Sequence, residues 1–279
     1  MREGPVRPLR TTLSVHLALI LFALLIVVPV VWTVAAGFRW QISLLMGEIW
    51  FEPTLDNFKE VLFSKTSDFL RNYQNSILIG LASTLLCLII GFLSAWSLTR
   101  GGWPQWLPAI FLGWAMVFNM IPPVALAGAW YHMARIVGLD NTYAGLIFAH
   151  TVLNLPMAIF LLMVFVRDVP AELEEAAIID GATTPILLRS IYLPLVGPGL
   201  AATAVLCFVF SWNEFAVSLN LSMRQTATVP VAIAKFAQDY EILYTQMAAA
   251  AALSMLPAFL LLLFAQQFIV RGLTQGAVK

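Results

Sequence analysis

One acidic residue, Glu214, stands inside an otherwise apolar run of the sequence, directly after Trp212 and Asn213. An unpaired carboxylate in hydrocarbon costs on the order of 2.5 to 3.5 kcal/mol on insertion scales. We therefore expect Glu214 to face a cavity or an interface, at a gate or along a solute path. The alternatives are a structural acid held by a partner group, or a residue at the membrane interface with Trp212 as its anchor.

Two asparagines within apolar runs lie close to prolines: Asn119 precedes Pro122 and Pro123, and Asn154 precedes Pro156. A proline inside a helix removes a backbone hydrogen bond and bends the helix. The simpler interpretation is a packing kink, but a polar side chain beside freed carbonyl groups suits a helix that lines a water-filled cavity. The candidate path or gate residues are therefore Asn119, Asn154, Trp212, Asn213 and Glu214.

The remaining residues that could do chemistry inside the apolar runs have simpler interpretations. We expect His150 to be packed or hydrogen-bonded, because no second metal-binding residue stands at helical spacing from it. Cys87 and Cys207 both fall in apolar runs, where a disulfide would require two helices to meet at those points. We predict buried free thiols and no metal site.

The polar connector 167–194 predicts two short helices with a bend between them. Pro170 suits a first helical turn, and three acids follow it where negative charge favours a helix N-terminus: Glu172, Glu174 and Glu175. Gly181 is typical of a helix C-terminus. The second helix is expected to begin with Thr184 as its N-cap and Pro185 in its first position, and Pro194 is expected at the entry of the next apolar run.

This connector is longer than a simple link requires. Its compact apolar residues, Ala176 to Ile179, suit insertion into a groove on a soluble partner. The alternative is an amphipathic helix that lies on the bilayer surface.

The elements that position these residues are predicted by composition. The chain has 279 residues, of which 61% are apolar and 11% are charged, whereas a soluble domain is close to half apolar and a quarter charged. We therefore predict an all-α integral membrane protein with a single transmembrane domain over 1–279. Spans of about 20 residues fit six apolar runs, at about 13–38, 72–98, 107–131, 143–166, 195–221 and 244–270.

Orientation follows from the excess of Lys and Arg on the side that holds both termini and the connector 167–194, which predicts that this side is cytoplasmic. The basic start and first apolar run resemble a signal peptide, but that run is too long, so we expect an uncleaved span. The formal net charge is zero, with no block of like charges, so a nucleic-acid partner is not expected.

The connector also contains a longer motif. It reads Glu175-Ala176-Ala177, then Asp180-Gly181-Ala182, then nine residues after the glycine, Ile191-Tyr192-Leu193-Pro194. This pattern resembles the EAA loop of the permeases of binding-protein-dependent ABC importers and matches every fixed position of that motif.

Two further stretches are similar to the carbohydrate-type group of that family, which includes the shorter membrane subunit of the maltose importer. Trp212-Asn213-Glu214 resembles a W-N-x element of the group, and the tail 271–279 resembles its C-terminus. The tail ends at Lys279, where many members have a further glycine. The likeness extends along nearly the whole chain.

The resemblance implies roles for these residues. The connector 167–194 would form an elbow that docks in a cleft of an ATPase subunit through Glu175, Ala176, Ala177, Asp180, Gly181, Ile191, Leu193 and Pro194. The tail would contact the ATPase dimer through Leu273, Thr274, Gly276 and Lys279. Implied partners are a second permease subunit, expected to be a different chain, a dimer of ABC ATPases, an extracytoplasmic binding protein and the lipid of the cell (inner) membrane.

The implied activity is translocation of a sugar or related polyol or glycoside by alternating access. The chain has no GxxxxGK[ST], GxSxG or HExxH motif, so we expect no catalysis and no cofactor in it, with ATP and magnesium held by the partner ATPase. The alternative from another class is an ion-coupled secondary carrier that uses Glu214 as its proton site. The solute itself stays open among sugars, polyols and glycerophosphate-like compounds.

Overall fold

The computed structural model describes residues 9–237 and 242–275, with side chains described for 13–237, 242–261 and 263. In these ranges the chain is helical, apart from connecting turns and one isolated β-bridge between Ala237 and Ile242. Five helices are long and apolar enough to cross a membrane: Leu13–Gly37, Phe69–Arg100, Tyr143–Arg167, Thr184–Trp212 and Tyr244–Leu261. A sixth candidate is a bent helix pair. The predicted all-α membrane fold is therefore confirmed.

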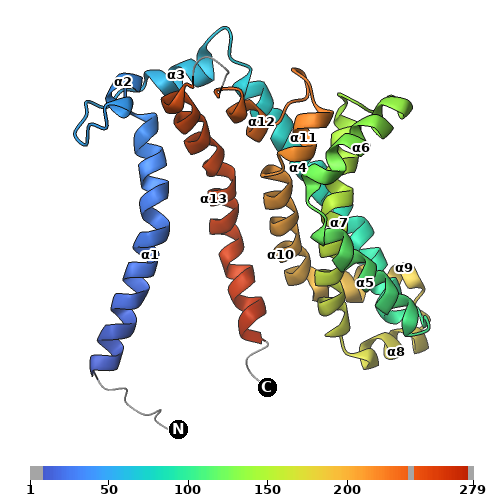
Figure 1. Cartoon of the computed structure of the whole chain (residues 1–279). Helices are drawn as coiled ribbons and strands as arrows, with labels where there is room; N and C mark the ends of the chain where they lie inside the picture. The colour runs from blue at the N-terminus through green and yellow to red at the C-terminus, as the bar shows by residue number, and fades with distance from the viewer. Residues whose placement is uncertain (1–8, 238–241, 276–279) are drawn as a thin grey trace. The chain divides into compact units, whose positions relative to one another are not determined.

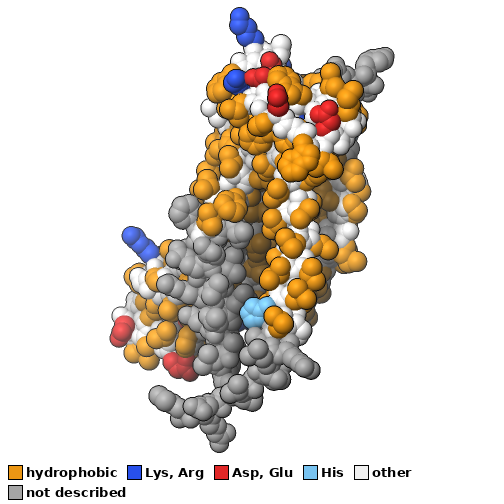
Figure 2. All heavy atoms as spheres, turned by 90° about the vertical axis from the view of Figure 1, so that its left-hand side faces the viewer, with side chains coloured by type: hydrophobic (Ala, Val, Ile, Leu, Met, Phe, Trp, Pro, Cys, Tyr) orange, Lys and Arg blue, Asp and Glu red, His pale blue; other side chains and the backbone are white. Residues whose placement is uncertain are grey.

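The described chain divides into two compact units. The first contains α1 (Leu9–Gly37), α2 (Gln41–Leu45), α3 (Asp56–Phe63) and the first turns of α13 (Tyr244–Gln275). Asn57 joins its parts, because its amide donates to the carbonyl groups of Gly37 and Arg39 at 2.9 and 2.7 Å, and Thr245 lies 3.0 Å from its side-chain oxygen. Figure 2 faces α1 and shows hydrophobic side chains along that helix.

Besides the part of α13 that begins at Met255, the second unit contains the helices from α4 to α12. They are α4 (Phe69–Arg100), α5 (Trp106–Met120), α6 (Pro123–Val137), α7 (Tyr143–Arg167), α8 (Ala171–Ile179), α9 (Thr184–Leu187), a π-helical turn (Leu188–Tyr192), α10 (Leu193–Trp212), α11 (Ala216–Leu221) and α12 (Val229–Ala234). Its centre is formed by α4, α7 and α10, which pack against one another (Figure 1).

A close helix approach explains the packing of α7 on α10. In lipid, helices associate through van der Waals packing, which favours small residues at their contacts. A Cβ atom at Gly199 of α10 would lie 2.3 Å from Cγ of Phe165 on α7. Glycine is therefore required at this position for the two helices to pack as they do.

The predicted span 107–131 corresponds to two helices, not to one continuous helix. The chain is helical as α5 and α6, but the two axes differ by 98° at the break between Met120 and Pro123. Pro122 is extended, with ψ of 132°, and a proline disfavours helical geometry in the residue before it. Two consecutive prolines therefore end α5 and start α6 in a new direction.

The predicted span 195–221 is also interrupted. The helix α10 ends at Trp212, and the short helix α11 begins at Ala216. The carboxylate of Glu214 accepts the backbone N–H groups of Val217 and Ser218, at 2.8 Å each. Glu214 thus satisfies the free donors of a new helix start, which explains why the chain restarts there. The other predicted spans agree with α1, α4, α7 and α13 to within a few residues.

Candidate functional site

The connector elbow, residues 167–194, bends at a glycine, as the sequence predicts. The helix α8 ends at Ile179 with Asp180 as its C-cap, and Gly181 follows with a φ of +84°, a conformation that residues other than glycine rarely adopt. The N–H of Ala182 donates to the carbonyl of Ala177 at 2.8 Å, and the N–H of Gly181 donates to that of Ile178 at 3.0 Å. These bonds close the helix end and reverse the chain.

The second half of the elbow differs from the prediction by one residue. The N-cap of α9 is Thr183, not Thr184, and Pro185 stands in the second helical position, not the first. No break separates this helix from the next span, because the chain is helical from Thr184 to Trp212. The π-helical turn Leu188–Tyr192 ends two residues before Pro194, which has no N–H group for a regular helical bond.

The tip of the elbow is exposed. Glu175, Ala176, Asp180 and Gly181 are exposed and Ala177 is half-buried. The neighbouring Ile178 and Ile179 are 55% and 85% exposed. Of the other predicted docking residues, Leu193 and Pro194 are exposed, whereas the half-buried Ile191 packs against the core of the second unit. The elbow therefore presents an apolar and acidic tip, available for a contact.

The base of the elbow is fastened to the helix bundle by a set of contacts that we call the Arg100 junction. Arg100, in the last turn of α4, donates to the carbonyls of Val166, in the last turn of α7, and of Val169, just beyond that helix, at 3.3 and 2.5 Å. Its Nε lies 3.9 Å from Oε2 of Glu174 on α8, and the Tyr192 hydroxyl donates to the same carboxylate oxygen. Four elements meet here.

This junction is not predicted from the sequence. In sequence, Glu174 is one of the acids near the start of a predicted helix, and Arg100 is one of the basic residues that flank the apolar runs. The three residues stand far apart in the sequence, and no periodicity joins them. The one sequence feature that could have indicated the junction is the position of Arg100 at the end of an apolar run. From there its side chain can reach the ends of neighbouring helices.

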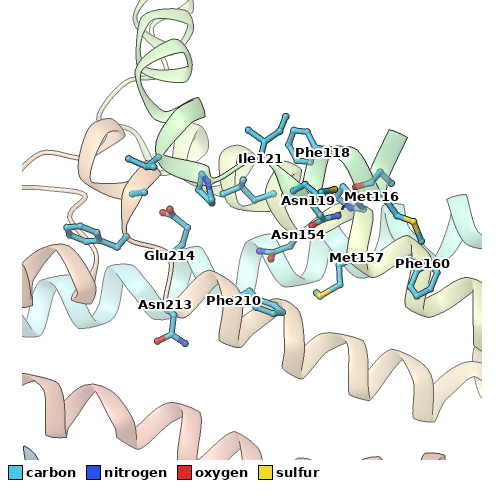
Figure 3. Close-up of a pocket in the computed structure, with 18 of the residues that line it drawn as sticks. Met116, Phe118, Asn119, Ile121, Asn154, Met157, Phe160, Phe210, Asn213 and Glu214 are labelled. Carbon is cyan, nitrogen blue, oxygen red and sulfur yellow. Dashed lines mark hydrogen bonds between the residues drawn. The ribbon is translucent and has the colours of Figure 1, made fainter. Parts of the chain in front are cut away.

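A cavity of about 810 Å³ lies in the second unit between α5, α6, α7 and the end of α10. It is lined by apolar and aromatic side chains, among them Met116, Met157, Phe160 and Phe210 (Figure 3). The break between α5 and α6 contributes Ile121 and Pro123 to the wall. The bend thus forms part of the cavity.

Four of the five candidate path or gate residues line this cavity: Asn119, Asn154, Asn213 and Glu214. Trp212 does not. It is 3% exposed, stacks on Phe208 with ring centres 5.7 Å apart, and meets Tyr73 edge-on at 5.3 Å. In Figure 3 Asn119 and Asn154 lie close together, whereas Glu214 and Asn213 project to opposite sides of the chain.

Behind the cavity, a hydrogen-bond network joins α4, α7, α10 and α11. His150, 1% exposed on α7, lies 2.6 Å from Ser211 through Nδ1 and 3.0 Å from Ser218 through Nε2. Ser211 in turn lies 3.1 Å from Ser83 on α4. The Ser218 hydroxyl donates to Oε2 of Glu214 at 2.8 Å, and His150 Nε2 lies 3.6 Å from that oxygen. His150 is therefore hydrogen-bonded, as predicted, and Glu214 is a partnered acid that also lines the cavity.

Cys87 and Cys207 are buried free thiols, as predicted, and they pack together with Ala158. Leu273 and Thr274 belong to the backbone of α13 but lie outside the described side chains, and Gly276 and Lys279 lie outside the described residues altogether. In the described part of the chain, no three His, Cys, Asp or Glu side chains converge as a metal site would require.

Comparison with known proteins identifies a family. The family model described as "Binding-protein-dependent transport system inner membrane component" matches residues 87–275. A trehalose transport system permease protein of Mycobacterium tuberculosis is 35% identical over 229 residues, 81% of this chain and 82% of that protein. A trehalose/maltose transport system permease protein of Thermococcus litoralis is 34% identical over 265 residues, 93% of this chain and 94% of that protein.

A third relative is a sulfoquinovosyl glycerol transport system permease protein of Agrobacterium fabrum. It is 30% identical and covers 90% of this chain and 88% of its own length. Among solved structures, a chain of a bacterial ABC transporter that imports the acidic polysaccharide alginate aligns with a TM-score of 0.77 and 21% identity, over 95% of this chain and 99% of that one. That likeness supports the fold.

Proposed function

This chain belongs to the family of inner membrane components of binding-protein-dependent transport systems, and from that premise we propose that it translocates a sugar or a related polyol or glycoside. It is a multi-pass membrane protein and a transport subunit. Its relatives include permeases named for trehalose, for trehalose and maltose, and for sulfoquinovosyl glycerol. They give no support to the ion-coupled secondary carrier.

The energy for transport would come from a dimer of ABC ATPase subunits, which would hold the ATP and magnesium. The exposed tip of the connector elbow supports this proposal most directly. Glu175 would pair with a basic residue in the cleft of an ATPase subunit, and the small side chains of Ala176 and Ala177 would permit close approach. The tail residues Leu273, Thr274, Gly276 and Lys279 would add a second contact.

The Arg100 junction supports a mechanism for transmission. Because Arg100 on α4 contacts Val166 of α7 and Glu174 of α8, and Tyr192 in the π-helical turn that leads into α10 bonds to Glu174, a displacement of α8 would move these helices together. ATP binding would close the ATPase dimer, and the elbow would act as a rigid lever on the bundle. The bundle would then open toward a binding protein loaded with solute, in an alternating-access cycle.

The proposed solute path runs along the cavity past Asn119, Asn154, Asn213 and Glu214, whereas Trp212 would act only by packing behind it. A second permease subunit, expected to be a different chain, would complete the path. The elbow and both termini would lie in the cytoplasm, consistent with the excess of basic residues on that side. The single transmembrane domain stays a prediction.

The test is ATP-dependent uptake by liposomes that contain the complete importer and its binding protein. We expect Glu175→Lys to abolish uptake and to lower binding of the ATPase subunit, because it would place like charges together in the cleft. The matched control is Glu172→Lys, which makes the same charge change at an exposed position of the same helix and should keep most of the uptake. Uptake by the chain without ATPase and ATP, or normal uptake by Glu175→Lys, would contradict the proposal.

A further inference from the structure

The described wall of the cavity carries negative charge and no positive charge. Among the described residues that line it, Glu214 is the only acid, and no Lys, Arg or His stands with it. The other polar lining residues are the neutral amides Asn119, Asn154 and Asn213, and the rest of the wall is apolar or aromatic. A bound anion would therefore meet one negative charge and no compensating positive charge.

Glu214 is held in a single arrangement. Its Oε1 accepts the N–H of Val217, and its Oε2 accepts both the N–H and the hydroxyl of Ser218, each at 2.8 Å. An ionised carboxylate is a pure acceptor, so both oxygens bond here as an ionised group does. Because these donors belong to α11 itself, the side chain cannot turn away from the cavity without opening the first turn of that helix.

His150 orients this acid without cancelling its charge. The Ser218 hydroxyl gives its hydrogen to Glu214, so the 3.0 Å contact between Ser218 and His150 requires a hydrogen on Nε2. Ser211 can give its hydrogen to Nδ1, while the Ser83 hydroxyl donates to the carbonyl of Gly80 at 3.2 Å and lies 3.1 Å from Ser211 Oγ. One ring hydrogen thus satisfies both ring nitrogens. A buried ring with both nitrogens bonded to hydroxyls needs no second proton, and a neutral ring avoids the cost of a buried charge.

From this arrangement we propose that the cavity takes uncharged polyhydroxylated solutes and discriminates against anionic ones, such as uronates and phosphorylated sugars. Glu214 is the residue that determines this specificity, and His150 with Ser218 positions it. Hydroxyl groups would bond to the carboxylate and the amides, while the apolar wall would pack against the carbon skeleton. Repulsion between unit charges a few ångströms apart in such a site disfavours the anion by on the order of tenfold or more. The proposal rests on the proposed transport function.

The charge of the cavity can be measured with a cysteine reporter. Cys87→Ala and Cys207→Ala remove the native thiols, and Ala216→Cys places a new thiol on the cavity wall, two residues from Glu214. The rates of its reaction with a cationic and with an anionic methanethiosulfonate are compared in membrane vesicles that contain the importer. We expect the cation-to-anion rate ratio to fall roughly fivefold or more when Glu214→Gln is added. The same ratio at Thr66→Cys, an exposed site in the first unit, should not change.

The solute class is tested by protection of the same Ala216→Cys thiol. The probes are 4-nitrophenyl β-D-glucoside and 4-nitrophenyl β-D-glucuronide, which differ only in a hydroxymethyl group against a carboxylate. We expect the glucoside to slow the reaction at lower concentration than the glucuronide, and Glu214→Gln to remove most of that preference. Equal protection by both, protection by neither, or a rate ratio insensitive to Glu214→Gln would overturn the proposal. Failure of ATP-dependent uptake would instead count against the transport function, because neither thiol measurement requires ATP.

Discussion

At the scale of single residues, the distance between neighbouring helices decides whether a glycine can be replaced by a larger residue. Gly197 and Gly199 stand two residues apart on α10, yet their surroundings differ. A Cβ atom at Gly199 would meet the ring of Phe165 at 2.3 to 2.8 Å, whereas nothing lies within 4 Å of one at Gly197. Two glycines in the same helix are therefore expected to respond in opposite ways to the same change.

We predict that Gly199→Ala destabilises the protein and that Gly197→Ala does not. The added methyl group of Gly199→Ala overlaps the Phe165 ring, which should lower stability by about 1 to 3 kcal/mol. Gly197→Ala adds a methyl group into open space and improves helix propensity by up to about 1 kcal/mol. Thermal unfolding of the purified chain in detergent measures both, and equal midpoints for the two variants would contradict the close packing of α7 on α10.

At the scale of helices, the breaks between the helices form the candidate site. The break at Pro122 supplies cavity wall, and the break after Trp212 places Glu214. Each arises because a short polar or proline-containing segment interrupts an apolar run that is otherwise long enough to continue. The connector elbow is a third break, fastened at its base and exposed at its tip.

We predict that replacing both prolines, Pro122→Ala with Pro123→Ala, straightens the 98° bend between α5 and α6. Alanine restores the missing N–H donor and favours a continuous helix. Spin labels at Gly113→Cys and Gly128→Cys, where a side chain meets open space, report the distance between the two helices after removal of the native cysteines. The distance should lengthen in the double variant. An unchanged distance would mean that packing, not proline, sets the bend.

The Arg100 junction predicts a loss of coupling. Arg100→Gln removes the ion pair with Glu174 and weakens the bonds to the carbonyls of Val166 and Val169, so the elbow should no longer move together with α4 and α7. We expect fewer solute molecules transported per ATP hydrolysed, measured in liposomes with the complete importer.

Arg189→Gln is the matched control for Arg100→Gln, because Arg189 is an exposed arginine in the same elbow and should tolerate the change. Equal coupling ratios in the two variants would contradict the proposed role of the junction.

The sequence predicted the helices well and their breaks poorly. Hydropathy located α1, α4, α7 and α13 to within a few residues, because spans of known length need apolar side chains along their whole course. It did not separate α5 from α6 or α10 from α11. A proline or an acid in an apolar run marks a disturbance, but whether the helix kinks or restarts depends on which donors and acceptors lie nearby.

The sequence predicted which residues belong to the candidate sites, but it did not predict how they are arranged in space. Asn119, Asn154, Asn213 and Glu214 were named from their polarity in apolar surroundings, and they do share one cavity. Trp212, their neighbour in sequence, points into the packed interior instead. The Arg100 junction was beyond prediction, since Arg100, Glu174 and Tyr192 come together only once α4, α8 and the π-helical turn before α10 are packed.

At the scale of the whole molecule, the bent pair α5 and α6 decides the topology. The described chain has five helices long and apolar enough to cross a membrane, besides this pair. If α5 and α6 together cross the membrane once, the elbow lies on the side opposite the connector between α1 and α4. If the pair enters and leaves on one face, the elbow and that connector lie on the same side.

We predict that the bent pair crosses. Thr66→Cys, in the connector before α4, should react with a membrane-impermeant maleimide in intact cells, and Thr183→Cys, in the elbow, should react only after the cells are made permeable. Both positions are exposed, and the native thiols are buried. Labelling of both positions in intact cells would show that the pair does not cross and would remove the proposed cytoplasmic position of the elbow.

The two exposed isoleucines at the tip of the elbow also affect how fast the chain is degraded in the cell. Ile178 and Ile179 lie on a polar connector in water, not in lipid, under the proposed topology. Exposed apolar side chains of this kind promote aggregation and attract proteases until they are covered. A chain made in excess of its ATPase partner should therefore be short-lived, so that the amount of the partner sets the amount of permease that the cell retains.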